Sequence, residues 1–280
     1  MAIVDEFGAG GRGDLARRYL AAHGLEAGEP TMALLREITR RHVATFPFSS
    51  VGVRLGDELP LAPERLLDRI VERERGGSCF EHNGLMFAVL AELGYDVTVR
   101  LARVINNGDH LPGLTHRTTH VRLDGATYVV DVGFGAAGPR QPVPMPAPDA
   151  LPGDPWPDGE EHRVVERRPG EFHLQHLRHG EPFSLYRFDL GVYGQADCEL
   201  GHFFSHRHPE AVFVNHLVAS RILDDEIRSL RNRDYRITRA DGDEDVSIAD
   251  ADHLTAVLRD DLGLNITDDE GRRLFAELPV

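Results

Sequence analysis

The chain has 280 residues and a formal net charge of −15, and all of its 31 Lys and Arg residues are arginines. This excess of acid argues against a nucleic-acid backbone or an anionic membrane as the main partner. Two cysteines, Cys79 and Cys198, are too few for a disulfide framework or a cysteine zinc site, so we expect a protein of the reducing cytoplasm. The first residues do not resemble a secretion signal, and no apolar run is long enough to cross a bilayer.

Residues 1 to about 95 are predicted to be mostly helical. Apolar residues recur at three- and four-residue spacings over 14–20 and over 31–42, which is typical of amphipathic helices. The Phe-Pro-Phe segment at 46–48 interrupts this pattern. A further amphipathic helix is predicted over 63–71, with a proline in its first turn.

The segment over 75–83, with the sequence RGGSCFEHN, carries the clearest signal for chemistry. Ser78 and Glu81 form a capping-box pattern, and the apolar run that follows predicts a helix over 78–93 that stops at Gly94. Cys79 then lies in the first turn, where unpaired N–H groups and the helix dipole favour a thiolate. The two preceding glycines allow a sharp turn that leaves the sulfur accessible. Cys79 is therefore a candidate nucleophile, and the alternative is a small buried core residue.

From about residue 96 the apolar pattern changes to alternation, which predicts strands. A strand is expected over 97–104, followed by a hairpin of strands 116–123 and 126–132 about an Asp-Gly turn. The proline-rich stretch 139–159 is predicted to be an extended loop between strands. Three more strand-like segments follow at 161–166, 172–177 and 183–188. The C-terminal portion is predicted to be helical, including residues 252–261 and 268–278.

A cysteine nucleophile usually needs a base and a group that orients the base, and the hairpin offers both. If its turn has two residues, Thr118 opposes Asp131, and both His116 and His120 share the face of that carboxylate as diagonal neighbours. A Cys-His-Asp triad then requires only that the hairpin pack against the start of the Cys79 helix. The pattern does not distinguish the two histidines, and a solvated surface acid is the alternative for Asp131.

A metal site built on the same histidines is not predicted. Two residues four apart along a strand are roughly 13 Å apart, which is too far for both to bind one ion.

Residues 75–84 resemble an Arg-Gly-Gly-x-Cys-x-Glu-x-Asn signature, and residues 131–135 read Asp-Val-Gly-Phe-Gly. Both patterns, in this order and spacing, are signatures of the arylamine N-acetyltransferases, which the chain resembles over nearly its whole length. The Pro-Phe segment at 47–48 is similar to one that lines the pocket in that family. A C-terminal pattern of His208, Pro209 and Phe213 is also similar.

The resemblance implies an α+β fold in three parts with a cysteine-protease-like Cys-His-Asp arrangement. An N-terminal helical bundle over 1–95 would carry the cysteine, and a central antiparallel β-barrel over 96–205 would carry the histidine and the aspartate. A C-terminal α/β lid would follow over 206–280.

The resemblance also implies an acyltransferase with a ping-pong mechanism. Cys79 would take an acetyl group from acetyl-CoA as a thioester and pass it to an arylamine or arylhydrazine, with His116 as the base and Asp131 as its orienting partner. The interval of fifteen positions between these two residues is family-like, which favours His116 over His120. Three phenylalanines would bind the substrate, namely Phe48, Phe134 and Phe204. No metal is implied.

The chain departs from the family at two places. Ser49 and Ser50 stand where the family has Glu-Asn, which we expect to remove an acid and an amide from the pocket entrance, and His202 replaces a smaller polar residue. These changes leave open a second function in the same family, an amide synthase that releases or cyclises a polyketide chain from a carrier protein. A non-catalytic binding module and a cysteine peptidase are the alternatives from other classes. The sequence does not decide the oligomeric state.

Overall fold

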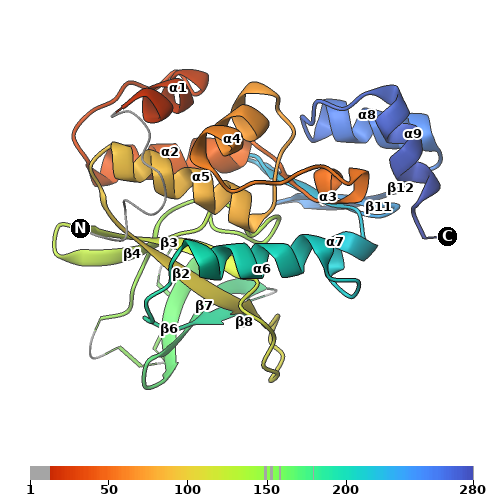
Figure 1. The fold of residues 1–280 in the computed structure, drawn as a ribbon. Coiled ribbons are helices and arrows are strands. Elements are labelled where there is room, and N and C mark those ends of the chain that lie inside the picture. Colours follow the sequence, from red (N-terminus) through yellow and green to blue (C-terminus); the bar gives the residue numbers. More distant parts are fainter. Residues whose placement is uncertain (1–12, 148–149, 152–153, 158, 179, 280) are drawn as a thin grey trace.

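The computed structural model describes residues 13–147, 150–151, 154–157, 159–178 and 180–279. Helices of the N-terminal part cover a seven-stranded antiparallel sheet that curves into a near-closed barrel, and a five-stranded sheet with its own helices lies beside them (Figure 1). This arrangement confirms the predicted α+β fold class.

The predicted N-terminal helices begin within one residue and end within three residues of the positions that the sequence pattern indicates, with the π-helix over Asp68–Glu72 counted as the continuation of the helix before it. A further short helix over Val51–Leu55 was not predicted. Thr31 caps one of them, because its hydroxyl accepts the N–H of Leu34 at 3.2 Å, and Pro63 occupies the first turn of another. The elements are α1 (Asp14–Ala22), α2 (Met32–Thr45), α3 (Val51–Leu55), α4 (Pro63–Leu67), the π-helix η2 (Asp68–Glu72) and α5 (Cys79–Glu92). Helix α5 is buried on nearly every side, which explains why its sequence is apolar all round.

The barrel strands follow the order β5-β4-β3-β2-β8-β7-β6. The predicted hairpin is confirmed, because Leu123 pairs with Ala126 across a two-residue turn. The strands are β2 (Asp96–Val104), β3 (His116–Leu123), β4 (Ala126–Val130), β5 (Val143–Pro144), β6 (His162–Arg168), β7 (Glu171–Arg178) and β8 (Glu181–Phe188). Strand β5 is a two-residue edge strand inside the proline-rich stretch, of which positions 148, 149, 152, 153 and 158 lie outside the described residues.

The prediction of a helical C-terminal portion is wrong for residues 218–247, which form four strands. Their sheet has the order β1-β9-β10-β11-β12, and its first strand, β1 (Phe48–Ser49), comes from the N-terminal part. The others are β9 (Val218–Ile222), β10 (Glu226–Arg231), β11 (Asp234–Arg239) and β12 (Gly242–Ser247). The sheet buries Leu230 and Tyr235 on one face, and ion pairs such as Arg236 with Asp245 join neighbouring strands among the exposed residues.

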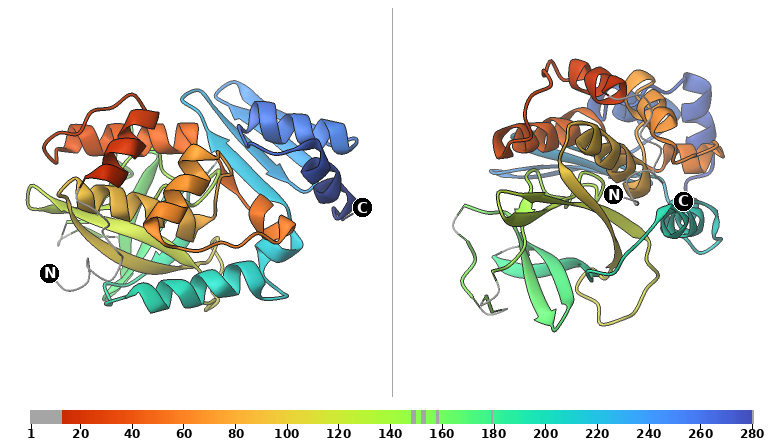
Figure 2. Two further views of the ribbon diagram at one scale, coloured as in Figure 1. Left: turned by 45° about the horizontal axis from the view of Figure 1, so that its top comes forward. Right: turned by 60° about the vertical axis from the view of Figure 1, so that its left-hand side comes forward.

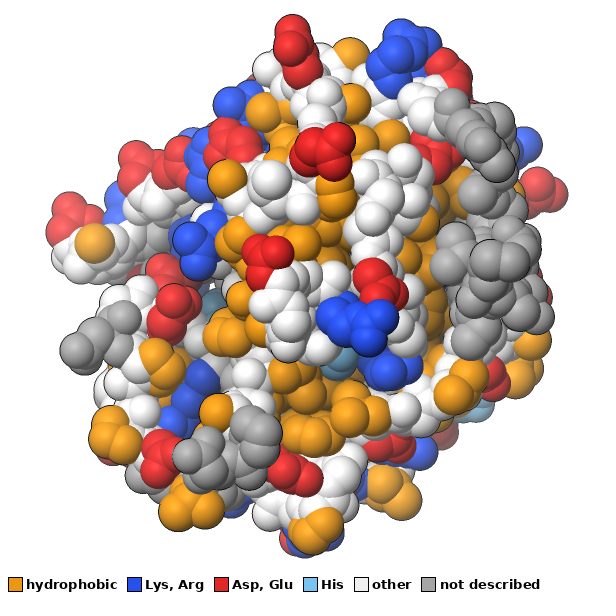
Figure 3. Space-filling model, turned by 90° about the vertical axis from the view of Figure 1, so that its left-hand side faces the viewer, with side chains coloured by type: hydrophobic (Ala, Val, Ile, Leu, Met, Phe, Trp, Pro, Cys, Tyr) orange, Lys and Arg blue, Asp and Glu red, His pale blue; other side chains and the backbone are white. Residues whose placement is uncertain are grey.

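Helices complete the C-terminal part. They are α6 (Gln195–Arg207), α7 (Val212–Asn215), α8 (Ala251–Ala256), the π-helix η3 (Val257–Asp261) and α9 (Asp268–Ala276). Helix α6 runs along the outside of the barrel, and α8 and α9 lie against the C-terminal sheet (Figure 2). Arginines lie among acidic side chains on the face shown in Figure 3, without a continuous basic patch. Within the described ranges, no helix has the length and apolar character that a bilayer crossing requires.

Candidate active site

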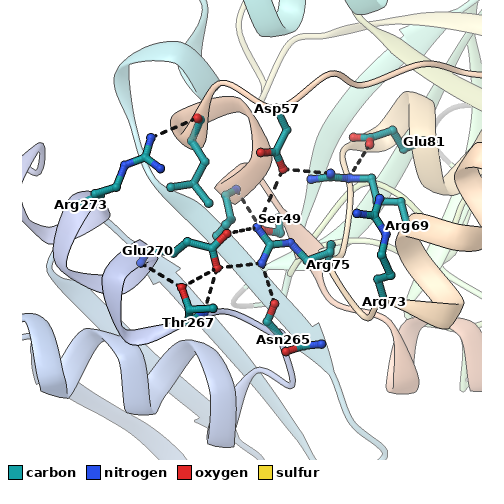
Figure 4. A network of polar contacts seen from close by, with 12 residues as sticks. Ser49, Asp57, Arg69, Arg73, Arg75, Glu81, Asn265, Thr267, Glu270 and Arg273 are labelled. Carbon is teal, nitrogen blue, oxygen red and sulfur yellow. Dashed lines mark hydrogen bonds and ion pairs between the residues drawn. The ribbon is translucent and has the colours of Figure 1, made fainter.

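Cys79 is the first residue of α5, as the capping pattern predicts. The backbone N–H of Ser78 donates to Glu81 Oε2 at 2.8 Å, which fixes the first turn of the helix. The other carboxylate oxygen of Glu81 forms an ion pair with Arg69 Nε at 3.1 Å, and Arg69 reaches Asp57 at 3.1 Å (Figure 4). The start of α5 is thus held by a buried charge network.

The arginine that opens the cysteine motif joins the site to the C-terminal part of the chain. Arg75 donates two hydrogen bonds to Glu270 of α9, at 2.7 and 2.9 Å, and a third to the carbonyl of Asn265 at 2.7 Å (Figure 4). A bidentate pair of this kind fixes both position and orientation. Arg75 therefore has a structural role at some distance from the sulfur.

The two glycines of the motif allow another segment of backbone to come close. Gly76 has φ of +62°, and a Cβ at this position would lie 2.6 Å from the carbonyl oxygen of Pro47. Beside it, Ser49 N–H donates to the carbonyl of Gly77 at 2.7 Å. The glycines thus seat residues 47–49 against the cysteine loop. The Cys79 side chain itself is only 4% exposed, so its accessibility depends on the cavity described below.

His116 and Asp131 are in direct contact. His116 Nε2 donates to Asp131 Oδ2 at 2.7 Å, and both side chains are buried. This hydrogen bond leaves Nδ1 as the ring nitrogen that is free to interact with the thiol of Cys79, and the same thiol contacts the carbonyl oxygen of Thr115 at 3.5 Å. The structure therefore brings together all three residues that the sequence predicted.

Asn83 fixes the carboxylate from the cysteine helix. Its side-chain N–H groups donate to Asp131 Oδ1 at 2.8 Å and to the carbonyl of Arg117 at 2.7 Å, while its oxygen accepts the N–H of Val132 at 3.0 Å. Gly133 N–H also donates to Asp131 Oδ1, at 3.0 Å. A Cβ at Gly133 would lie 2.9 Å from both the Cys79 Cα and the Asn83 amide nitrogen, so close packing requires glycine here.

The electrostatics of the site favour a protonated histidine. Burial by itself lowers the pKa of His116, but the charge and hydrogen bond of Asp131, followed by those of Cys79, raise it to about 10. Burial also tends to raise the pKa of Asp131, yet His116, Asn83 and Gly133 together hold it below its ordinary value. An imidazolium beside the sulfur stabilises a thiolate.

His120 occupies a different environment. It shares the barrel-facing side of β3 with His116, but its ring packs edge-on against Phe188, with centroids 5.1 Å apart. Burial and then the charge of Arg100 lower the pKa of His120 to about 3, so the ring is neutral. Within the described residues, no hydrogen bond connects His120 to Asp131.

A cavity of about 470 Å³ opens over Cys79 and His116. All three predicted substrate-binding phenylalanines line it, and so do several residues that sequence reasoning did not assign to the site, including Thr115, Glu210, Phe213 and Arg231. Phe213 belongs to a C-terminal pattern that was visible in the sequence. The sequence did not indicate that Arg231 lines the cavity, because Arg231 is the last residue of strand β10, which was not predicted.

The expectation that Ser49 and Ser50 alter the pocket entrance is wrong. Both are buried, and neither lines the cavity at Cys79. The Ser50 hydroxyl donates to the carbonyl of His216 at 3.1 Å and accepts the N–H of Val218 at 2.9 Å. These serines therefore join β1 to the C-terminal sheet. His202 is also buried, and its Nε2 donates to the carbonyl of Leu59 at 2.8 Å.

A second hollow of about 780 Å³ adjoins the first and extends over the C-terminal sheet. The two share Phe48, Phe134, Phe213, Val218 and Arg231 in their walls. No group of three or more His, Cys, Asp or Glu side chains in the described part of the chain is arranged to hold a metal ion.

Comparisons with known proteins agree with this geometry. Residues 31–270 match the sequence model of a family described as N-acetyltransferase. The arylamine N-acetyltransferase of Mycobacterium tuberculosis is 36% identical over 248 residues, which cover 86% of each chain. The arylamine N-acetyltransferase / N-hydroxyarylamine O-acetyltransferase of Salmonella typhimurium is 32% identical over 253 residues, or 89% of this chain and 88% of that protein.

Solved structures show the same fold. The Mycobacterium marinum arylamine N-acetyltransferase in complex with CoA superposes with a TM-score of 0.85 and 31% identity, covering 95% of this chain and all of that one. The fold and these relatives define the protein as an acyltransferase. The chain belongs to the arylamine N-acetyltransferase family.

Proposed function

We propose that this protein transfers an acetyl group from acetyl-CoA to an arylamine or arylhydrazine through a thioester on Cys79. The observation that carries the proposal is the single cavity that contains both Cys79 and His116, with His116 bound to a buried carboxylate at 2.7 Å. The CoA complex of the relative from M. marinum supports a CoA thioester as donor.

In the first half-reaction the Cys79 thiolate attacks the carbonyl carbon of the donor thioester. The helical hydrogen bonds of α5 begin with the N–H groups of Glu81 and His82, which donate to the carbonyl of Ser78 at 3.1 and 2.9 Å. The N–H groups of Cys79 and Phe80 precede them and stabilise the oxyanion that develops. The tetrahedral intermediate collapses with cleavage of the bond to the CoA sulfur, and His116 gives its Nδ1 proton to that leaving thiolate. The acetyl group then resides on Cys79.

In the second half-reaction the amine attacks the thioester carbonyl carbon. His116, now neutral, takes a proton from the attacking nitrogen, and the bond to the Cys79 sulfur breaks. The thiolate and the imidazolium are restored. Asp131 holds the ring in the orientation that presents Nδ1 to the sulfur throughout, and it stabilises the imidazolium.

The cavity walls suit these two substrates. Phe48 and Phe213 pack with ring centroids 5.5 Å apart, and Phe134 packs edge-on against His116 at 5.2 Å, so an aromatic amine finds aromatic surfaces beside the sulfur. Arg231 lies in both hollows and is exposed. Its guanidinium is placed to meet the phosphates of a CoA donor.

A second candidate function, the amide synthase, is favoured by one observation. The hollow of about 780 Å³ that adjoins the cysteine cavity gives the site more room than a small arylamine needs. A long acyl chain on a carrier-protein arm would occupy that room.

Kinetics with small substrates separate the two functions. The protein is incubated with acetyl-CoA in the presence and absence of a panel of arylamines and arylhydrazines, and release of CoA is measured. The proposal predicts that amines accelerate CoA release many-fold, with parallel lines in a double-reciprocal analysis. No acceleration by any amine of the panel would favour the synthase.

A further inference from the structure

A chain of buried polar side chains lies directly behind the wall of the cysteine cavity. Tyr19 Oη and His42 Nδ1 are 2.8 Å apart, His42 Nε2 and His82 Nδ1 are 2.8 Å apart, and His82 Nε2 lies 3.1 Å from the carbonyl oxygen of Pro47. All three side chains have a relative exposure of 0%. They connect α1, α2 and α5 to the residue that precedes Phe48.

Only one placement of the hydrogens satisfies all the hydrogen bonds of this polar series. A carbonyl oxygen can only accept, so His82 Nε2 must carry a hydrogen. Burial lowers the pKa of His82 to about 4 and that of His42 well below its ordinary value, so both rings are neutral. His82 Nδ1 must then accept from His42 Nε2, and His42 Nδ1 must accept from the hydroxyl of Tyr19.

The last hydrogen bond of this polar series, from His82 to Pro47, lies next to the active site. Pro47 is followed by Phe48, which lines the cavity at Cys79. His82 is one helical turn beyond Cys79 on α5, so the bond from His82 to Pro47 sets the distance between the cysteine helix and this wall. Ser49 N–H, bound to Gly77, fixes the segment on its other side.

We infer that His82 is a positioning residue, which places Phe48 over Cys79 through its hydrogen bond to Pro47, while His42 Nε2 donates to its other ring nitrogen. This inference rests on the proposed function, because it concerns how the acceptor is held during acyl transfer. The side chains of Tyr19, His42 and His82 do not touch the substrate. Removing the bond to Pro47 releases the α5 side of the segment that carries Phe48, which stays paired with Ser220 on its other side. This loosens the acceptor wall, while the sulfur, its base and its carboxylate keep their contacts.

Two substitutions of His82 test the roles of its two ring nitrogens separately. His82→Gln retains an N–H near the position of Nε2 and so keeps the bond to Pro47, whereas His82→Asn retains only a group near Nδ1 and loses that bond. We expect His82→Asn to lower kcat/KM for the arylamine by about 5-fold or more, mainly through KM. His82→Gln should restore it to within about 2-fold, and acetylation of Cys79 by acetyl-CoA should change little in either variant.

Controls distinguish positioning from loss of stability. Thr39→Ala removes a buried hydroxyl of the same helical layer, whose bond to the Leu35 carbonyl is 2.8 Å long, and should lower Tm without changing acceptor KM. Tyr19→Phe keeps every ring and the bond to Pro47, and it removes only the hydroxyl that donates to His42, so acceptor KM should stay within about 2-fold of wild type. His82→Leu, which fills a similar volume without a polar group, should raise acceptor KM as His82→Asn does, and it carries the test if His82→Asn does not fold.

The inference is overturned if folded His82→Asn or, failing that variant, His82→Leu binds acceptors as the wild type does, or if His82→Gln is as impaired as the variant that loses the bond. The proposed function fails in a different way, since the wild-type protein itself would then not acetylate arylamines.

Discussion

The properties of Cys79 come from its neighbours more than from its own position. A helix N-terminus favours a thiolate, but the structure adds a histidine whose pKa is raised to about 10 by Asp131 and by the thiol itself, against the effect of burial. Cys198 also lies in the first turn of a helix, α6, but it has no exposed surface and burial raises its pKa.

Alkylation should therefore distinguish the two cysteines. We expect iodoacetamide near neutral pH to modify Cys79 many-fold faster than Cys198, as measured by peptide mass spectrometry over time. Cys79→Ser serves as the control for assignment of the modified peptide. Equal rates at the two cysteines would show that no activated thiolate exists.

Asp131 is expected to hold the proton on His116. The pKa of His116 is higher in the folded protein than its ordinary value of 6.5, so the stability from this pairing is complete below about pH 6.5 and is lost as pH rises through about 10. Asp131→Asn removes the charge but keeps the shape. Its His116 pKa, followed by NMR of the labelled imidazole, should fall by more than about 2 units. An unchanged value would assign the shift to another group.

The two histidines of β3 can be compared directly. His116→Ala should abolish acetylation of Cys79, whereas His120→Ala should retain it, because His120 packs against Phe188 and is not bonded to Asp131 in the described structure. Single-turnover acetylation with acetyl-CoA measures both. Full activity in His116→Ala would refute the choice of base.

At the scale of elements, loops and strands meet at a few positions where only glycine fits. Gly133 is one of these, since an added Cβ would come within 2.9 Å of the Cys79 Cα. Gly133→Ala should therefore lower both stability and the rate of Cys79 acetylation by about 10-fold or more, measured by thermal unfolding and single-turnover kinetics. Gly28→Ala is the matched control, because no atom lies within 4 Å of its Cβ position and its φ is not positive. Equal effects of the two substitutions would contradict the packing argument.

The ion pair between Arg75 and Glu270 connects two further elements. The hydrogen bonds of Arg75 lower the pKa of Glu270 to about 2 from an ordinary value of 4.5, so its stabilising effect is present above about pH 4.5 and is lost as pH falls towards 2. Glu270→Gln should cost about 1 to 2 kcal/mol at neutral pH, and the difference from wild type should shrink below pH 4.5 in denaturant titrations. A difference that is independent of pH would assign the loss to packing.

The elements were predictable where local pattern decides them. The capping residues gave the start of α5, and the Asp-Gly turn gave the register that brings β3 beside Asp131. The strands over 218–247 were not predictable in the same way, because the few residues of their apolar face, such as Leu230 and Tyr235, stand among many charged residues, including cross-strand pairs such as Arg236 with Asp245. Arg231, and with it part of the cavity wall, was missed for that reason.

At the scale of the whole molecule, the site draws on distant parts of the chain. Helix α5 supplies the cysteine, the barrel supplies the histidine and the aspartate, and the C-terminal part supplies Phe213 and Arg231. Strand β1 crosses between them, since Phe48 pairs with Ser220. The division into domains at residues 95 and 205 stays a prediction. The burial of Ser49 and Ser50 could not be read from the sequence, because Ser50 bonds to partners more than 150 positions away and Ser49 pairs with Ala219.

The central claim is that Cys79 carries the acyl group between donor and acceptor. Intact and peptide mass spectrometry after incubation with acetyl-CoA alone should show the mass of one acetyl group on Cys79 and on no other residue. Addition of an arylamine should then remove that mass and yield one equivalent of acetylated amine, while Cys79→Ser should show neither event. Two results would contradict the account. One is acetylation of the amine by an enzyme on which no modified Cys79 accumulates in the absence of acceptor. The other is full activity of Cys79→Ser.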